Sequence, residues 1–172
     1  MTTNEDRAKE HLLDWLRDAH AMEEQAETML KGMAGRLEHY PVLRQRIEQH
    51  IVETQGQARQ VASCLERIGG SNSALKDTGG KMMAAAQNFS GMFASDEVVK
   101  GALFSYAFEH MEIASYRSLV AAARLVGDQA TADICAGILA EEEAMAKWLE
   151  EHMDQLTAEF LQRSRQGEPA KR

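Results

Sequence analysis

Two glutamates inside one apolar segment carry chemistry that core packing alone does not explain. Residues 101–126 repeat apolar side chains at the three- and four-residue spacing of a helix that faces a core, and Glu109 and Glu112 occupy positions of that stripe. A buried carboxylate must stay protonated, pair with a positive charge or bind a cation. Because the stripe contains no Lys or Arg, a metal ion is the remaining candidate.

Two further segments place an acid at a core-facing position. Glu23 interrupts an otherwise apolar helical stripe, and Glu142 falls in the stripe of the last long segment. Glu142 belongs to a run of three glutamates. Helical phase favours Glu142 as the inward one, although Glu143 follows a secondary apolar stripe.

The spacing of the acids repeats along the chain. Glu23 and Glu53 are 30 residues apart, and so are Glu112 and Glu142. Superposing the two halves therefore places one glutamate on each helix at matching height. Chance could produce equal spacing, but less easily for acids that were selected by their inward phase.

The helices that must position these acids follow from periodicity and capping signals. The first is predicted over about residues 4–38 and the second over 41–68, where His50, Glu53 and Gln57 flank the inward stripe. The third begins after residues 95–97 and stops at Gly127, and Asp128 caps the fourth.

The connection between the second and third helices is about 25 residues long, which is too long for a hairpin. A crossover along the bundle explains its length, and residues 76–89 could form a short helix within it. We therefore predict an all-α, ferritin-like four-helix bundle over residues 1–165, with a polar tail over 166–172.

Composition excludes several classes of function. The chain has 172 residues and a net charge of −8, which fits one domain and argues against nucleic acid as a partner. It has no apolar segment of membrane-spanning length and no basic signal sequence at its start, so we expect a cytoplasmic protein that does not enter membranes. Cys64 and Cys135 are expected to be buried and reduced. Met-rich apolar segments at residues 82–86 and 92–93 predict a homodimer.

Five segments together resemble a known family. They cover residues 11–23, 46–54, 95–101, 108–116 and 138–143. They are similar to the YciE/YciF family of bacterial ferritin-like stress proteins, with the closest likeness to YciE, and the similarity extends over nearly the whole chain. This resemblance implies a rubrerythrin-like bundle and a di-metal site far more firmly than it implies a reaction.

By that resemblance, five glutamates are the candidate ligands of two metal ions, and hard oxygen donors favour iron or manganese. They are Glu23, Glu53, Glu109, Glu112 and Glu142. In the common di-iron pattern a His follows a ligand Glu by three residues, but Gly56 and Met145 stand at those positions here. His50 instead precedes Glu53 by three residues, and it is either a further metal ligand or a hydrogen-bond partner behind the ligands.

Two other side chains have similarly open roles. His20 precedes Glu23 as His50 precedes Glu53, and Tyr116 is either a hydrogen-bond donor to a ligand or a core tyrosine. His110 points away from the stripe and is expected to be structural.

Three functions remain open from the sequence. The first is a di-iron or di-manganese enzyme that reacts with peroxide or dioxygen, with a separate electron donor because the chain has no Cys-x-x-Cys motif. The second is metal binding or storage without turnover. The third is a structural, stress-induced protein.

Overall fold

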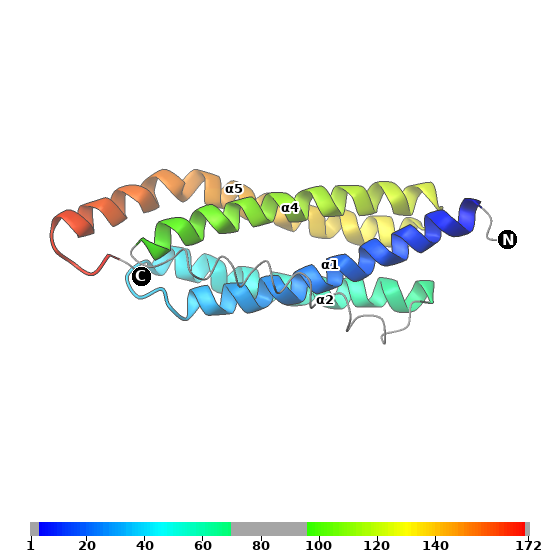
Figure 1. Cartoon of the computed structure of the whole chain (residues 1–172), viewed down its shortest axis with the longest axis horizontal. Coiled ribbons are helices and arrows are strands. Elements are labelled where there is room, and N and C mark those ends of the chain that lie inside the picture. The colour runs from blue at the N-terminus through cyan, green and yellow to red at the C-terminus, as the bar shows by residue number, and fades with distance from the viewer. Residues whose placement is uncertain (1–3, 70–95, 171–172) are drawn as a thin grey trace.

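Four long helices run side by side in an elongated bundle (Figure 1). The computed structural model describes residues 4–69 and 96–170. The helices of that part of the chain are α1 (Asn4–Ala34), α2 (Pro41–Ile68), α4 (Glu97–Leu125) and α5 (Gln129–Arg165). The predicted all-α bundle is therefore confirmed.

The helices pack as two antiparallel hairpins. α1 packs against α2 and α4 against α5, and the hairpins join through α1–α4 and α2–α5 contacts. α2 ends at the end of the bundle opposite to that at which α4 begins (Figure 1), which confirms the predicted long crossover. The short helix predicted over 76–89 and the Met-rich segments behind the predicted dimer lie outside the described residues.

Local sequence explains most of the helix ends. Pro41 opens α2 at a position where its missing N–H would have no helical partner. Gly69 and Gly127 adopt positive φ angles of 89° and 80°, which an L side chain resists, at the ends of α2 and α4. Asp128 caps α5 as predicted, because its Oδ1 accepts a hydrogen bond from Thr131 N at 3.1 Å.

α1 is shorter than the sequence pattern predicts. The periodicity suggests an end near residue 38, whereas the helix ends at Ala34. The turn that follows still buries Leu37 and Tyr40 in the core. The apolar spacing therefore continues past the helix itself, which is why periodicity alone overestimates its length.

Two apolar clusters fill the bundle, one toward each end. One contains Leu16, Val61, Leu119 and Ile138. The other contains Leu43, Ile47, Val98 and Leu149. All four helices contribute to each cluster. On α2 the buried residues His50, Thr54 and Gln57 lie between the positions of the two clusters, as Glu142 does on α5. None of the described helices is both long enough and apolar enough to span a membrane.

Candidate metal centre

A layer of buried polar side chains lies in the middle of the bundle, where the two apolar clusters meet. Four of its members are glutamates with 0–2 % of their surface exposed, and a fifth is a histidine at 1 %. They are Glu23 from α1, His50 from α2, Glu109 and Glu112 from α4, and Glu142 from α5. Each of these four glutamates lies on the inward face that its helical phase predicts. They come from three helices, and His50 adds α2, so all four helices meet in this layer.

His50 is the cationic partner at the centre of this layer. Its Nε2 lies 3.3 Å from Glu109 Oε2 and 3.5 Å from Glu142 Oε2. Its Nδ1 lies 2.8 Å from Glu53 Oε2. Burial disfavours the charged imidazole, but the hydrogen bonds to Glu109 and Glu53 outweigh it and raise the pKa of His50 to about 10.

One imidazole does not neutralise four buried carboxyl groups. Burial and the neighbouring Glu109 carboxyl group raise the pKa of Glu142 to about 10. Burial and the charge of Glu23 raise the pKa of Glu112 well above its usual range. Burial also raises the pKa of Glu23 to about 7, although a hydrogen bond from Tyr116 works in the opposite direction. Carboxyl groups thus outnumber the cationic groups of this layer, and without a bound ion they tend to keep their protons.

The geometry matches the requirements of a bound cation. One atom from each of His50, Glu109, Glu112 and Glu142 can be chosen so that all four lie within 4.8 Å of one another. Buried polar atoms normally have a hydrogen-bond partner. Here Glu23 Oε2, Glu112 Oε1 and both carboxylate oxygens of Glu142 have none. A bound metal ion would satisfy these oxygens, which have no hydrogen-bond partner.

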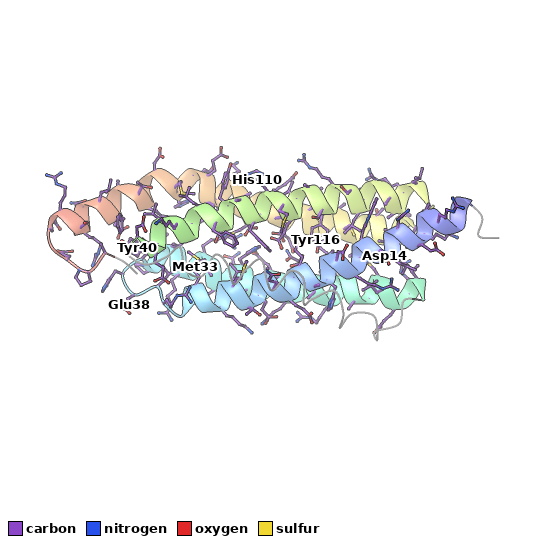
Figure 2. The ribbon with its side chains drawn as sticks, viewed as in Figure 1. Asp14, Met33, Glu38, Tyr40, His110 and Tyr116 are labelled. Carbon is purple, nitrogen blue, oxygen red and sulfur yellow. The ribbon has the colours of Figure 1, made fainter. Side chains whose placement is uncertain are left out.

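Glu23 and Tyr116 join α1 to α4 at the edge of this group. The Tyr116 hydroxyl donates a hydrogen bond to Glu23 Oε1, and Tyr116 lies between α4 and α1 in Figure 2. Tyr116 thus donates to a candidate ligand and is also a buried member of the apolar core, and whether Glu23 is a ligand stays a prediction. Burial and the neighbouring Glu23 charge also raise the pKa of the phenol, so it remains a donor.

Glu53 does not enter the buried group. Its side chain is 23 % exposed, and its oxygens accept hydrogen bonds from His50, from Gln49 at 2.9 Å and from Arg46 at 3.1 Å. The hydrogen bond from His50 is the main cause that lowers the pKa of Glu53 to about 2. Glu53 therefore lies behind the imidazole, on the side away from Glu109 and Glu142.

The remaining candidates of the sequence are placed outside the layer. Glu143 is exposed and pairs with Arg117 at 2.6 Å, so Glu142 is the inward member of its run. His20 Nδ1 lies 3.8 Å from Glu24 on the same helix. His110 is exposed on the outer side of α4 (Figure 2), where its ring meets Tyr106 edge-on.

Two polar residues of α2 belong to the layer although the sequence analysis assigns them no role. Thr54 and Gln57 are 1 % and 0 % exposed. A stripe read through Ile51 and Ala58 puts His50 and Gln57 at its flank, whereas the structure buries both. The signal that could have found them is the three-and-four spacing of residues 43, 47, 50, 54, 57 and 61, all of which are buried.

Comparison with known proteins defines the family. Residues 7–162 match the family described as Domain of unknown function (DUF892). The chain belongs to this family. A YciF protein is among the solved structures that share its fold, which agrees with the resemblance to the YciE/YciF family, whereas the closer likeness to YciE stays a prediction.

Three solved structures show the same fold. A protein from Xanthomonas campestris pv. campestris is 48 % identical, with 92 % of this chain and 99 % of that chain covered and a TM-score of 0.78. YcfI from Rhodopseudomonas palustris, for which a structural role has been suggested, is 25 % identical over 87 % and 97 % of the two chains, with a TM-score of 0.70. The E. coli stress protein YciF is 23 % identical over 89 % and 96 %, with a TM-score of 0.68.

Proposed function

We propose that this DUF892 protein holds two metal ions, iron or manganese, in its buried polar layer and uses them in redox chemistry with peroxide or dioxygen. The observation that carries the proposal is the group of buried carboxylate oxygens without hydrogen-bond donors on Glu23, Glu112 and Glu142. Leaving a buried polar group unsatisfied costs about 1–3 kcal/mol, and more for a charged one. A cation between the helices would remove several such costs together.

The chain offers a nitrogen and several carboxylate oxygens to the ions. His50 Nε2, Glu109 and Glu142 face one another at 3.3 and 3.5 Å and would hold one ion. The charges of Glu23 and Glu142 both raise the pKa of Glu112, so Glu112 would help to hold a second ion together with Glu23. Hard oxygen donors with an imidazole suit iron and manganese.

Glu53 would act through His50. A ligating imidazole commonly donates its other N–H to a carboxylate, which fixes the tautomer and the ring orientation. The 2.8 Å contact between His50 Nδ1 and Glu53 Oε2 has this arrangement and leaves Nε2 for an ion. Arg46 and Gln49 hold the Glu53 carboxylate in place.

The redox part of the proposal rests on donor chemistry and on the relatives. When bound, a metal pair would supply the electrons that reduce peroxide or dioxygen, and anionic oxygen ligands would favour its more oxidised state. The helices exclude water from the layer, and the Tyr116 hydroxyl keeps a proton next to Glu23. A role in bacterial stress is supported by the E. coli stress protein YciF and by the sequence likeness to YciE.

A second candidate is a structural or metal-binding role without turnover. It is favoured by YcfI, a relative for which a structural role has been suggested. In that case the ions would stabilise the middle of the bundle and would not react with oxidants.

Metal content is the first test. Protein produced without added metal is analysed for its elements, and we expect about two ions of iron or manganese per chain. Protein that contains no transition metal, and that takes up neither Fe²⁺ nor Mn²⁺ on dialysis, would disprove the proposal.

The reaction is tested by anaerobic stopped-flow. Wild type loaded with Fe²⁺ is mixed with peroxide or with dioxygen, beside a Glu112→Ala variant and a matched Glu143→Ala control. We expect Glu112→Ala to lose at least one ion and the fast oxidation, whereas Glu143→Ala, which changes an exposed glutamate on α5, behaves as wild type. If wild type oxidises iron no faster than Glu112→Ala does, the structural or binding role replaces the enzyme.

A further inference from the structure

The orientation of Gln57 is dictated by a neighbouring carboxylate. Its Nε2 donates a hydrogen bond to Glu141 Oε2 at 2.9 Å across the α2–α5 contact. A carboxylate only accepts hydrogen bonds, so the amide NH₂ must face Glu141 and the amide oxygen must face the other way. That oxygen, Gln57 Oε1, is buried and has no hydrogen-bond partner. The hydrogen bond to Glu141 thus leaves a neutral, unpartnered oxygen of Gln57 buried in the bundle.

Thr54 presents a second neutral oxygen on the same face of α2. Hydroxyl groups on helices usually donate to the carbonyl four residues earlier, and Thr28, Ser115 and Thr157 all do so, at 2.9–3.0 Å. The hydroxyl of Thr54 makes no such bond and is buried without a partner. Because Thr54 and Gln57 are three residues apart, their side chains emerge from the same side of the helix.

Glu23 and Glu112 belong to the same buried layer as these neutral oxygens. The Tyr116 hydroxyl donates to Glu23 Oε1, and Tyr116 follows Glu112 by four residues on the same face of α4, so Glu23 lies beside that face. Gln57 is held by Glu141, the neighbour of Glu142 on α5. Glu23 Oε2 and Glu112 Oε1 are also buried and unpartnered. Four unpartnered oxygens thus lie in the layer that contains His50.

We propose that the two metal positions are chemically different, and that the second one is formed only by oxygens, from Glu23, Glu112, Gln57 and Thr54. This inference rests on the proposed function, because it assigns ligands within the same polar layer. The first position keeps the imidazole of His50 with Glu109 and Glu142, and Glu112 lies between the two.

The difference predicts which ions each position prefers. Carboxylate, amide and hydroxyl oxygens are hard donors that suit Mn²⁺ and Mg²⁺, whereas an imidazole strengthens binding of Fe²⁺, Co²⁺ and Zn²⁺. The position of Gln57 should therefore take Mn²⁺ readily and Zn²⁺ poorly, and the position of His50 should take both.

The test counts Mn²⁺ bound to the metal-free full-length chain, from the loss of the free-ion signal in electron paramagnetic resonance. Gln57→Leu and Thr54→Val each remove one oxygen with little change of shape. We expect two ions on wild type. Each variant should bind one ion with unchanged affinity. It should bind the other about tenfold more weakly or not at all, which is the size of loss found when residues of a metal site are changed.

Gln55→Leu is the matched control. Gln55 lies on the same helix, but its amide donates to Glu27 at 2.6 Å on another face, so this variant should bind both ions as wild type does. Circular dichroism establishes that all variants keep their helices. The Zn²⁺ count should be one per chain and should not change in Gln57→Leu.

The outcomes separate this inference from the proposed function. Two ions on wild type with unchanged affinities in both Gln57→Leu and Thr54→Val would overturn the inference alone. So would an equal loss in Gln55→Leu. A single ion on wild type that Gln57→Leu leaves in place would overturn the inference and also the two-ion count of the proposed function. No Mn²⁺ or Fe²⁺ on wild type would overturn the proposed function itself.

Discussion

The ends of the bundle and its middle are made from the same four helices but are stabilised by opposite means. At the ends, side chains such as Leu16 and Leu43 are fully buried among other apolar groups, which is favourable without any ligand. In the middle, the helices bury Glu23, Glu112 and Glu142, which disfavour one another's ionisation and each of which has at least one oxygen without a hydrogen-bond partner. The apolar ends thus stabilise the fold enough to bury several carboxyl groups together in its middle, which is unfavourable by itself but suited to binding cations.

The largest effect should come from the apolar end. Leu43→Ala removes a fully buried side chain from the cluster around Ile47 and Leu149. We expect the free energy of unfolding to fall by about 2–5 kcal/mol, because the transfer energy is lost and a cavity remains. Urea denaturation of the metal-free protein measures it. Val42→Ala, at an exposed neighbouring position, should change the free energy of unfolding by less than about 0.5 kcal/mol. Equal losses in the two variants would mean that burial in this cluster does not stabilise the end of the bundle.

Metal removal should weaken only the middle. An ion that binds the native state alone adds about 2.7 kcal/mol when its free concentration is a hundred times its Kd. Protein shown to contain metal should therefore melt at a lower temperature after treatment with EDTA, as scanning calorimetry would record. An unchanged melting temperature would mean that the ions do not lie in the buried layer.

The pH dependence of the metal-free protein sharpens the contrast further. Burial raises the pKa of Glu23 to about 7 and that of Glu142 to about 10, so the folded state holds protons that the unfolded state releases above pH 4.5. The stability linked to these protons is complete below pH 4.5 and is lost as the pH rises through 7 toward 10.

The raised pKa of His50 acts in the same direction between pH 6.5 and about 10. The lowered pKa of Glu53 has the opposite sign, but its effect is confined to pH values between about 2 and 4.5. Denaturation midpoints at pH 5, 7 and 9 should therefore decrease in that order for the metal-free protein. A midpoint that rises from pH 5 to pH 9 would show that the carboxyl groups of the layer are not buried together.

The smallest effect should come from the surface beside the layer. Arg117 and Glu143 form an exposed ion pair between α4 and α5 at 2.6 Å. Such pairs are screened by water and contribute at most about 1 kcal/mol. Arg117→Ala should therefore leave the denaturation midpoint almost unchanged and should not alter the number of bound ions. A large loss of either would mean that Glu143 takes part in the site.

Helical phase and capping chemistry were sufficient to predict much of this molecule. The start and end of α2, the cap of α5 at Asp128 and the inward positions of Glu23, Glu109, Glu112 and Glu142 all follow from local spacing and agree with the structure. They could be predicted because a residue's direction from its own helix depends only on that helix, and a long apolar stripe defines the direction well.

Tertiary structure alone decided what α2 brings to the layer. The 30-residue repeat makes Glu53 the counterpart of Glu142, yet His50 is buried and Glu53 lies behind it. The apolar positions of α2 allow either rotation of the helix, and contacts with α5 and α4 select the one that turns His50 and Gln57 inward. Periodicity defines a face only to within the angle between neighbouring positions, so partners distant in the sequence determine which polar side chain enters the core.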